Sequence, residues 1–153
     1  MISNSSPLIF LSKINQLGLL RKLFNKITIP KAVQEEILIK DKPGFIELKE
    51  ALENWIEISN VKKNEDFGLG KGENAAINLA RERRDELIID DSMAIKTAAV
   101  LGINCYRTTS VILKAMHKKF INKKEAMNLI NNIIEEGYYI SPQVYLKIVS
   151  SIK

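Results

Sequence analysis

Three acidic residues lie at positions where a helix would turn them toward the protein interior. Glu73 and Asp91 each precede small or apolar residues three, four and seven positions further on, and Glu36 follows Ala32 and Val33 by one turn. An unpaired buried carboxylate costs several kcal/mol. Each of these acids must therefore be neutralised, paired with a cation, or gathered around a metal ion.

Each acid also has a purely structural interpretation. Asp90, Asp91 and Glu73 lie near expected helix N-termini, where acids cap free amides and complement the helix dipole, and for each residue taken singly this interpretation is favoured. Glu36 lies in the second turn and cannot cap its helix, so its structural interpretation is a pair with Lys40 at i+4. The location of Asp90 and Asp91 favours a functional role. Both residues end a hydrophobic strand, and ligands collect at the carboxyl ends of strands in open α/β sheets.

The elements that would position these acids alternate between strands and helices. The patterns predict strands at 1–4, 55–61, 86–90 and 103–107, a brief apolar segment at 27–30, and helices at 7–15, 17–25, 32–40, 44–54, 73–84, 91–101, 109–119, 123–137 and 141–153. Such alternation favours parallel pairing with right-handed crossovers. The predicted fold class is therefore α/β, with helices covering a parallel sheet and Asn4 closing its first strand.

Length and composition predict one domain over residues 1–153, with 111–153 as a helical C-terminal part. The chain has 153 residues, 46% of them hydrophobic, and we find no repeat or linker. No uncharged apolar run is long enough to cross a membrane, and the N-terminus lacks the basic region of a secretory signal. Cys105 is the lone cysteine, which excludes an intrachain disulfide and a thiolate-rich zinc site, and its setting indicates a buried strand residue. We expect a cytoplasmic protein.

Other catalytic classes are less well supported. His117 is the only histidine and lies in a basic, surface-like stretch, which disfavours a Ser-His-Asp or Cys-His site. The glycine-rich GLGKGE at 68–73 lacks the ending of a P-loop and follows a polar loop rather than a strand. The net charge of +5 permits a polyanionic ligand without indicating one.

Four blocks, taken in order, resemble PIN domains, in particular a small prokaryotic PIN-like branch. The blocks are ISNSSPLIFLSKI, IPKAVQEEI, GKGENAAINLARE and LIIDDSMAIKTAAVLGI, and the resemblance extends over about the first 110 residues. It implies a three-layer α/β/α fold whose central parallel sheet has about four or five short strands, followed here by C-terminal helices. It also implies a metal-dependent nuclease that uses Mg²⁺ or Mn²⁺.

The resemblance assigns site residues position by position. The four acidic positions fall on Asn4, Glu36, Glu73 and Asp91, which are the expected catalytic residues. The expected metal ligands are Glu36, Glu73, Asp90 and Asp91. Asn4 departs from the usual Asp and contributes an amide oxygen without negative charge, so weaker metal binding is expected.

A second set of residues is expected to contact substrate. Ser6 matches a small hydroxyl residue two positions after the first site. Arg107 ends the strand at 103–107, and Thr108 and Thr109 follow it. The two threonines also suit a simpler role as caps of a helix beginning at Val111.

The functional expectation is an endoribonuclease that hydrolyses phosphodiester bonds with one or two divalent ions. The resemblance implies the toxin component of a toxin-antitoxin pair, with RNA as substrate, a small antitoxin protein as partner, and a homodimer. The alternative is a catalytically degenerate module that keeps the fold and binds RNA or a protein without cleavage. Tyr138 and Tyr139 are candidates for stacking on bases, although packing against the core is the more common role near a helix end.

Overall fold

A parallel sheet of five strands forms the centre of the structure, a computed structural model that describes residues 1–153. Its strand order is β3-β2-β1-β4-β5, and every neighbouring pair runs parallel. The predicted α/β class is therefore confirmed. The strands are β1 Ile2–Ser3, β2 Ile27–Pro30, β3 Ile56–Ser59, β4 Leu87–Ile88 and β5 Cys105–Tyr106.

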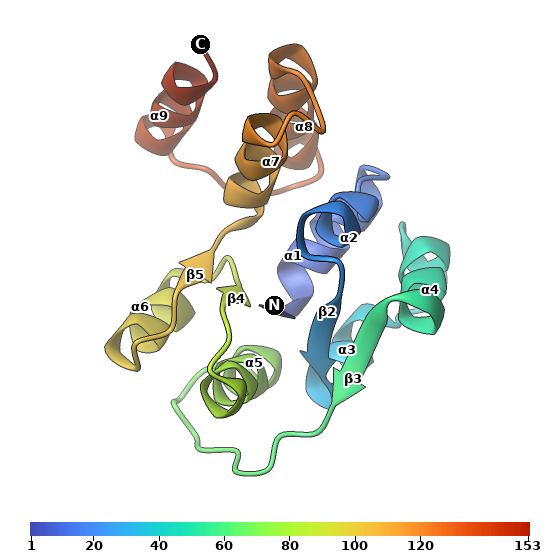
Figure 1. Ribbon diagram of the computed structural model, residues 1–153, viewed down its shortest axis with the longest axis vertical. Helices are drawn as coiled ribbons and strands as arrows, with labels where there is room; N and C mark the ends of the chain where they lie inside the picture. The colour runs from blue at the N-terminus through green and yellow to red at the C-terminus, as the bar shows by residue number, and fades with distance from the viewer.

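Nine helices surround this sheet (Figure 1). None of them is long and apolar enough to cross a membrane. The helices are α1 Ser5–Lys13, α2 Gly18–Phe24, α3 Lys31–Ile37, α4 Phe45–Asn54, α5 Lys71–Arg83, α6 Ser92–Val100, α7 Thr108–His117, α8 Lys123–Glu135 and α9 Pro142–Ile152.

Two apolar clusters lie on opposite faces of the sheet and give the fold its three layers. Successive side chains of a strand point to opposite faces. In β4 and the residue after it, Leu87 and Ile89 pack with α5 and α6, whereas Ile88 belongs to the larger cluster on the other face. That larger cluster joins α1, α2, α4 and α7, and it continues into α8 and α9. The last three helices gather at one end of the molecule, drawn in orange and red in Figure 1.

The strand order places a topological switch point beside β1. The chain passes from β1 to β2 on one side, and β4 later pairs with β1 on the other side. Connections that leave neighbouring strands in opposite directions open a crevice at the carboxyl ends of those strands. Asn4, Asp90 and Arg107 follow β1, β4 and β5 at this edge.

Candidate functional site

A hollow of 420 Å³ lies at the carboxyl ends of β1, β4 and β5. It is lined by polar residues from the strand ends and the start of α5, and by the loop between α8 and α9. The lining residues are Asn4, Ser6, Phe10, Glu73, Asp90, Asp91, Ser92, Arg107, Gly137, Tyr138 and Tyr139.

Asn4 lines this hollow, and its side-chain oxygen accepts no hydrogen bond. The residue is 3% exposed, and its backbone amide donates to the carbonyl of Ile88 at 2.9 Å, which ties the end of β1 to β4. Its side chain does not cap α1, and its Oδ1 atom is buried without a hydrogen-bond partner. A buried polar atom of this kind costs roughly 1–3 kcal/mol, so it suggests a site that a ligand completes.

Unlike the side-chain oxygen of Asn4, the carboxylate of Asp90 has hydrogen-bond partners, because four donors bond to it. Oδ1 accepts from the Thr108 amide at 2.8 Å and from the Tyr138 hydroxyl at 2.5 Å, while Oδ2 accepts from the hydroxyls of Thr108 at 2.7 Å and Ser6 at 3.0 Å. A carboxylate offers about four acceptor positions. The expected metal ligand Asp90 therefore has its acceptor capacity filled by the protein itself.

Asp91 differs from the sequence expectation in its burial. The residue is exposed and caps α6, with Oδ2 accepting from the amide of Ala94 at 2.8 Å. The spacing of apolar residues placed it on the buried stripe, but an N-cap precedes the first helical turn and has extended backbone, here φ −65° and ψ 126°. Its other oxygen, Oδ1, accepts no hydrogen bond within the chain, and Asp91 lines the hollow.

Arg107 closes one side of the same hollow. Its guanidinium donates to the carbonyl of Asp90 at 2.6 Å and to Oγ of Ser92 at 3.2 Å. A guanidinium carries five N–H donors, so most of them remain available to a ligand. This position at the rim of the hollow suits contact with an anionic group.

The two glutamates reach the site from different sides. Glu73 is half-buried, is the third residue of α5 and lines the hollow, with its carboxylate folded over Gly70. The Glu36 carboxylate accepts a hydrogen bond from Oγ of Ser5 and lies against Gly72. It borders a separate, more apolar groove of 330 Å³ beside α4. No ion pair joins Glu36 to a lysine.

The structure thus brings Asn4, Glu73, Asp90 and Asp91 to one hollow, whereas Glu36 lies against Gly72 and lines a different groove. No group of three or more His, Cys, Asp or Glu side chains is close enough to hold a metal ion. The acids are therefore arranged around an open space rather than assembled into a closed cage.

Two of the expected hydroxyl residues, Ser6 and Thr108, contact Asp90, a more specific role than capping a helix. Helix α7 begins at Thr108, earlier than the expected Val111, so both threonines belong to its first turn and Arg107 is the N-cap. The hydroxyls of Ser6 and Thr108 both donate to Asp90. Thr109 is buried and does not line the hollow.

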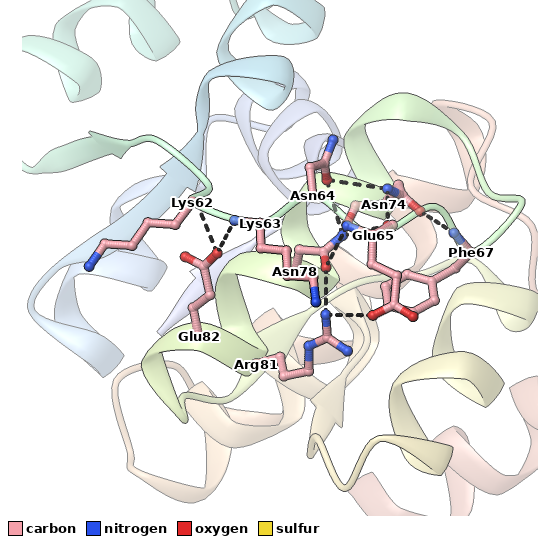
Figure 2. Close-up of polar contacts among 9 residues, drawn as sticks. All are labelled: Lys62, Lys63, Asn64, Glu65, Phe67, Asn74, Asn78, Arg81 and Glu82. Carbon is pink, nitrogen blue, oxygen red and sulfur yellow. Dashed lines mark hydrogen bonds and ion pairs between the residues drawn. The ribbon is translucent and has the colours of Figure 1, made fainter.

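A network of polar contacts fixes the loop that leads into α5 (Figure 2). The side chain of Asn78 donates to the carbonyl of Glu65 at 2.8 Å and to Oδ1 of Asn64 at 3.0 Å, and Asn74 accepts from the amide of Phe67 at 2.8 Å. Arg81 adds an ion pair with Glu65 at 2.8 Å. These contacts hold the loop along α5 and so define where the helix that carries Glu73 begins.

Tyr138 bonds to Asp90, a contact that the sequence did not predict, since the sequence indicates only base stacking or packing against the core for this residue. It is 7% exposed, its ring packs edge-on against Phe10 with centroids 5.2 Å apart, and its hydroxyl bonds Asp90. Burial first, and then the charge and hydrogen bond of Asp90, raise the pKa of Tyr138 far above its ordinary value. Its neighbour Tyr139 is 83% exposed, and no local pattern distinguishes the two. The roles of Ser5 and Ser92 were missed for the same reason, since their partners lie on other elements.

Comparison with known proteins agrees with this architecture. The family described as DUF3368: PIN domain matches residues 1–153. A solved structure of a PilT N-terminus domain protein from the hyperthermophilic archaeon Sulfolobus solfataricus P2 is similar in fold, with a TM-score of 0.55 and 20% sequence identity. The match covers 76% of this chain and 94% of that one. The comparison with curated proteins gave no match. With the family matching its whole length and the PIN-like sheet in place, this chain belongs to the PIN-domain family, which has a nuclease-type fold.

Proposed function

We propose that this protein is a metal-dependent endoribonuclease that hydrolyses phosphodiester bonds at the hollow beside β1 and β4. The observation that carries the proposal is the buried Oδ1 atom of Asn4, which has no partner although it lies at the edge of the sheet where Glu73 and Asp91 also converge. An oxygen without a donor beside two carboxylates is suited to a cation.

The residues fit Mg²⁺ or Mn²⁺ in ligand type. Mg²⁺ prefers oxygen ligands and keeps several of its waters, so a few protein oxygens suffice. Asn4, Glu73 and Asp91 would hold the ion, and Glu36, whose carboxylate lies against Gly72 and bonds Ser5, would act beside them. When bound, such an ion activates a water molecule and neutralises charge on the phosphate.

The remaining residues support this arrangement through the chain's own contacts. Asp90 is assigned a positioning role, because its four donors fill its acceptor positions. Ser6 and Thr108 act by holding Asp90 rather than by contacting substrate. Arg107 is the residue that we assign to the phosphate, because its guanidinium is fixed at the rim of the hollow by two contacts on one side.

The test compares RNA cleavage by the wild-type protein and by Asp91→Asn, each with Mn²⁺ or with a chelator. Asparagine caps a helix about as well as aspartate, so this variant loses charge while keeping the cap. Glu53→Gln, an exposed acid on α4, is the matched control. We expect Mn²⁺-dependent cleavage by the wild type and the control, and a loss of about 100-fold for Asp91→Asn. Equal, metal-independent decay with all three proteins would reject the proposal.

We further propose that the protein is the toxin of a toxin-antitoxin pair, and that it acts as a cytoplasmic homodimer formed by the PIN-like domain of residues 1–153. The support is the family's nuclease-type fold and the resemblance of its blocks to small prokaryotic PIN proteins. Induced expression in bacterial cells should arrest growth for the wild type and not for Asp91→Asn. Light scattering of the purified protein tests the dimer.

A non-catalytic RNA-binding module is the second candidate. Asn4 supports it, because an amide in place of a carboxylate supplies no negative charge for a metal ion. The absence of three closely spaced acids supports it as well. Binding of RNA without decay, by both the wild type and Asp91→Asn, would favour this function over cleavage.

A further inference from the structure

The C-terminal part of the chain supplies one of the four donors that hold Asp90. Tyr138 lies 48 residues beyond Asp90, in the loop between α8 and α9, yet its hydroxyl is 2.5 Å from Oδ1. The other donors, Ser6 and Thr108, come from the first turns of α1 and α7. Removal of the Tyr138 hydroxyl would leave Oδ1 with the Thr108 amide alone.

A backbone turn and core packing fix the position of Tyr138 near Asp90. Helix α8 ends before Gly137, whose φ of +101° is a conformation that favours glycine and reverses the chain toward the site. The amide of Tyr138 then donates to the carbonyl of Ile133 at 2.9 Å, and its ring packs edge-on against Phe10 of α1. The backbone hydrogen bond and the ring packing therefore both fix the position of the Tyr138 hydroxyl.

Asp90 is in turn fixed along its backbone, and Asp91 follows it directly. Arg107 donates to the carbonyl of Asp90 at 2.6 Å, and the next residue, Asp91, caps α6 with one oxygen. With one carboxylate oxygen committed to the cap, the direction of the other depends on the orientation of the Asp90–Asp91 turn. Hydrogen bonds to an ionised carboxylate are the strongest of those available to fix that turn.

We propose that Tyr138 is a positioning residue: its hydroxyl ties the α8–α9 loop to the Asp90–Asp91 turn and thereby sets the direction of the free Asp91 oxygen. This inference rests on the proposed function, since it assigns Tyr138 a part in the same site. With this role for Tyr138, the loop between the C-terminal helices α8 and α9 is part of the site.

The central variant is Tyr138→Phe, which keeps the ring packing on Phe10 and removes only the hydroxyl. Tyr145→Phe is the matched control, because it removes an equivalent hydroxyl that donates to Asn131 at 3.0 Å between α9 and α8, away from the hollow. Both variants are measured by titration of Mn²⁺ alone, by steady-state cleavage of a labelled RNA, and by urea unfolding without metal.

The expected result is specific to Tyr138. Loss of a residue that orients a metal-binding group typically weakens metal binding or activity by about 10- to 100-fold. For Tyr138→Phe we expect the Mn²⁺ dissociation constant to rise, and kcat at saturating Mn²⁺ to fall, by about tenfold. KM for RNA should stay unchanged. Tyr145→Phe should match the wild type in both measurements.

A double variant tests whether Tyr138 acts through Asp90. Ser6→Ala removes another donor from the same carboxylate, so its effect on Mn²⁺ affinity should be non-additive with that of Tyr138→Phe. Its effect should be additive with that of Tyr145→Phe, which shares no partner with it.

The outcomes separate this inference from the proposed function. If the wild type cleaves RNA and Tyr138→Phe loses only unfolding stability, with Mn²⁺ affinity and kcat unchanged, the positioning role is overturned and the nuclease stands. If the wild type does not cleave RNA but Tyr138→Phe weakens its Mn²⁺ binding, the positioning role stands and the nuclease is overturned. A wild-type protein that binds no Mn²⁺ would overturn both.

Discussion

The carboxylate of Glu36 lies against the α-carbon of Gly72, so that a β-carbon added there would come within 2.7 Å of Cδ of Glu36 and nearer still to its oxygens. Gly72 is the second residue of α5, and Glu36 is the sixth residue of α3. The absence of a side chain at residue 72 is therefore what lets Glu36 reach Ser5, the first residue of α1.

The variant Gly72→Ala should separate the position of Glu36 from the stability of the fold. The added methyl group displaces a flexible carboxylate rather than backbone, and alanine is favoured over glycine in a helix by about 1 kcal/mol. The free energy of unfolding should therefore change by no more than about 1 kcal/mol. RNA cleavage with Mn²⁺ should fall about tenfold, as for other residues that support metal ligands.

The control for this change is Gly18→Ala, a helical glycine at which a β-carbon meets nothing within 4 Å. It should retain full cleavage activity. If Gly72→Ala also retained it, Glu36 would have no part in the site.

Asn4→Asp should have opposite effects with and without metal. A carboxylate at a residue that is 3% exposed lacks a compensating charge in the metal-free protein, so the free energy of unfolding should fall by roughly 2 kcal/mol or more. With Mn²⁺ the added charge strengthens binding, and the metal-induced rise in Tm should exceed that of the wild type. Asn104→Asp, at an exposed residue before β5, should show neither effect. Equal metal-induced shifts for Asn4→Asp and the wild type would argue against Asn4 as a ligand.

Asn78→Ala should loosen the loop that leads into α5. Asn78 is fully buried and bonds both the amide and the carbonyl of Glu65 (Figure 2). Its removal leaves the Glu65 amide without a partner, whereas the Glu65 carbonyl keeps its bond from Asn74. We expect a loss of roughly 2–3 kcal/mol in the free energy of unfolding by urea. Asn54→Ala, whose exposed side chain makes one local bond to Glu50, should lose less than about 0.5 kcal/mol. A similar loss for both variants would mean that the network adds no stability of its own.

Cys105 should react slowly with thiol reagents in the native protein. The residue lies half-buried in β5, and burial raises the pKa of its thiol, so the reactive thiolate forms at higher pH than the ordinary value of about 8.5. Above the ordinary thiol pKa, Cys105 of the unfolded chain releases a proton that the native protein retains. The Cys105 thiol therefore makes the free energy of unfolding fall as pH rises. The rate of disulfide exchange with an aromatic disulfide, measured from pH 7 to 9 with and without guanidinium, checks the first statement. Identical native and unfolded rates would contradict the placement of β5.

Sequence patterns predicted the elements well because the signals for them are local. The alternation of strands and helices gave the parallel α/β arrangement. The four expected strands and all nine helices form near the expected positions, and the brief apolar segment at 27–30 forms β2. The differences lie at the ends of helices. Helix α5 begins at Lys71 and α7 at Thr108, each a few residues before the expected start, and α3 ends at Ile37 rather than at residue 40. Contacts with the preceding loop and with Asp90 contribute to the first turns of α5 and α7.

The sequence by itself also determined that Asn4 and Asp90 lie at one edge of the sheet, because parallel strands end on the same side. Only the tertiary structure decided which oxygens remain free there. Asp90 is saturated, Asp91 caps a helix, and Asn4 is left without a partner, through contacts that span up to 84 residues of chain. Tyr138 joined the site in the same way. Periodicity and spacing describe the chain within a few turns, whereas these hydrogen bonds depend on how distant elements pack.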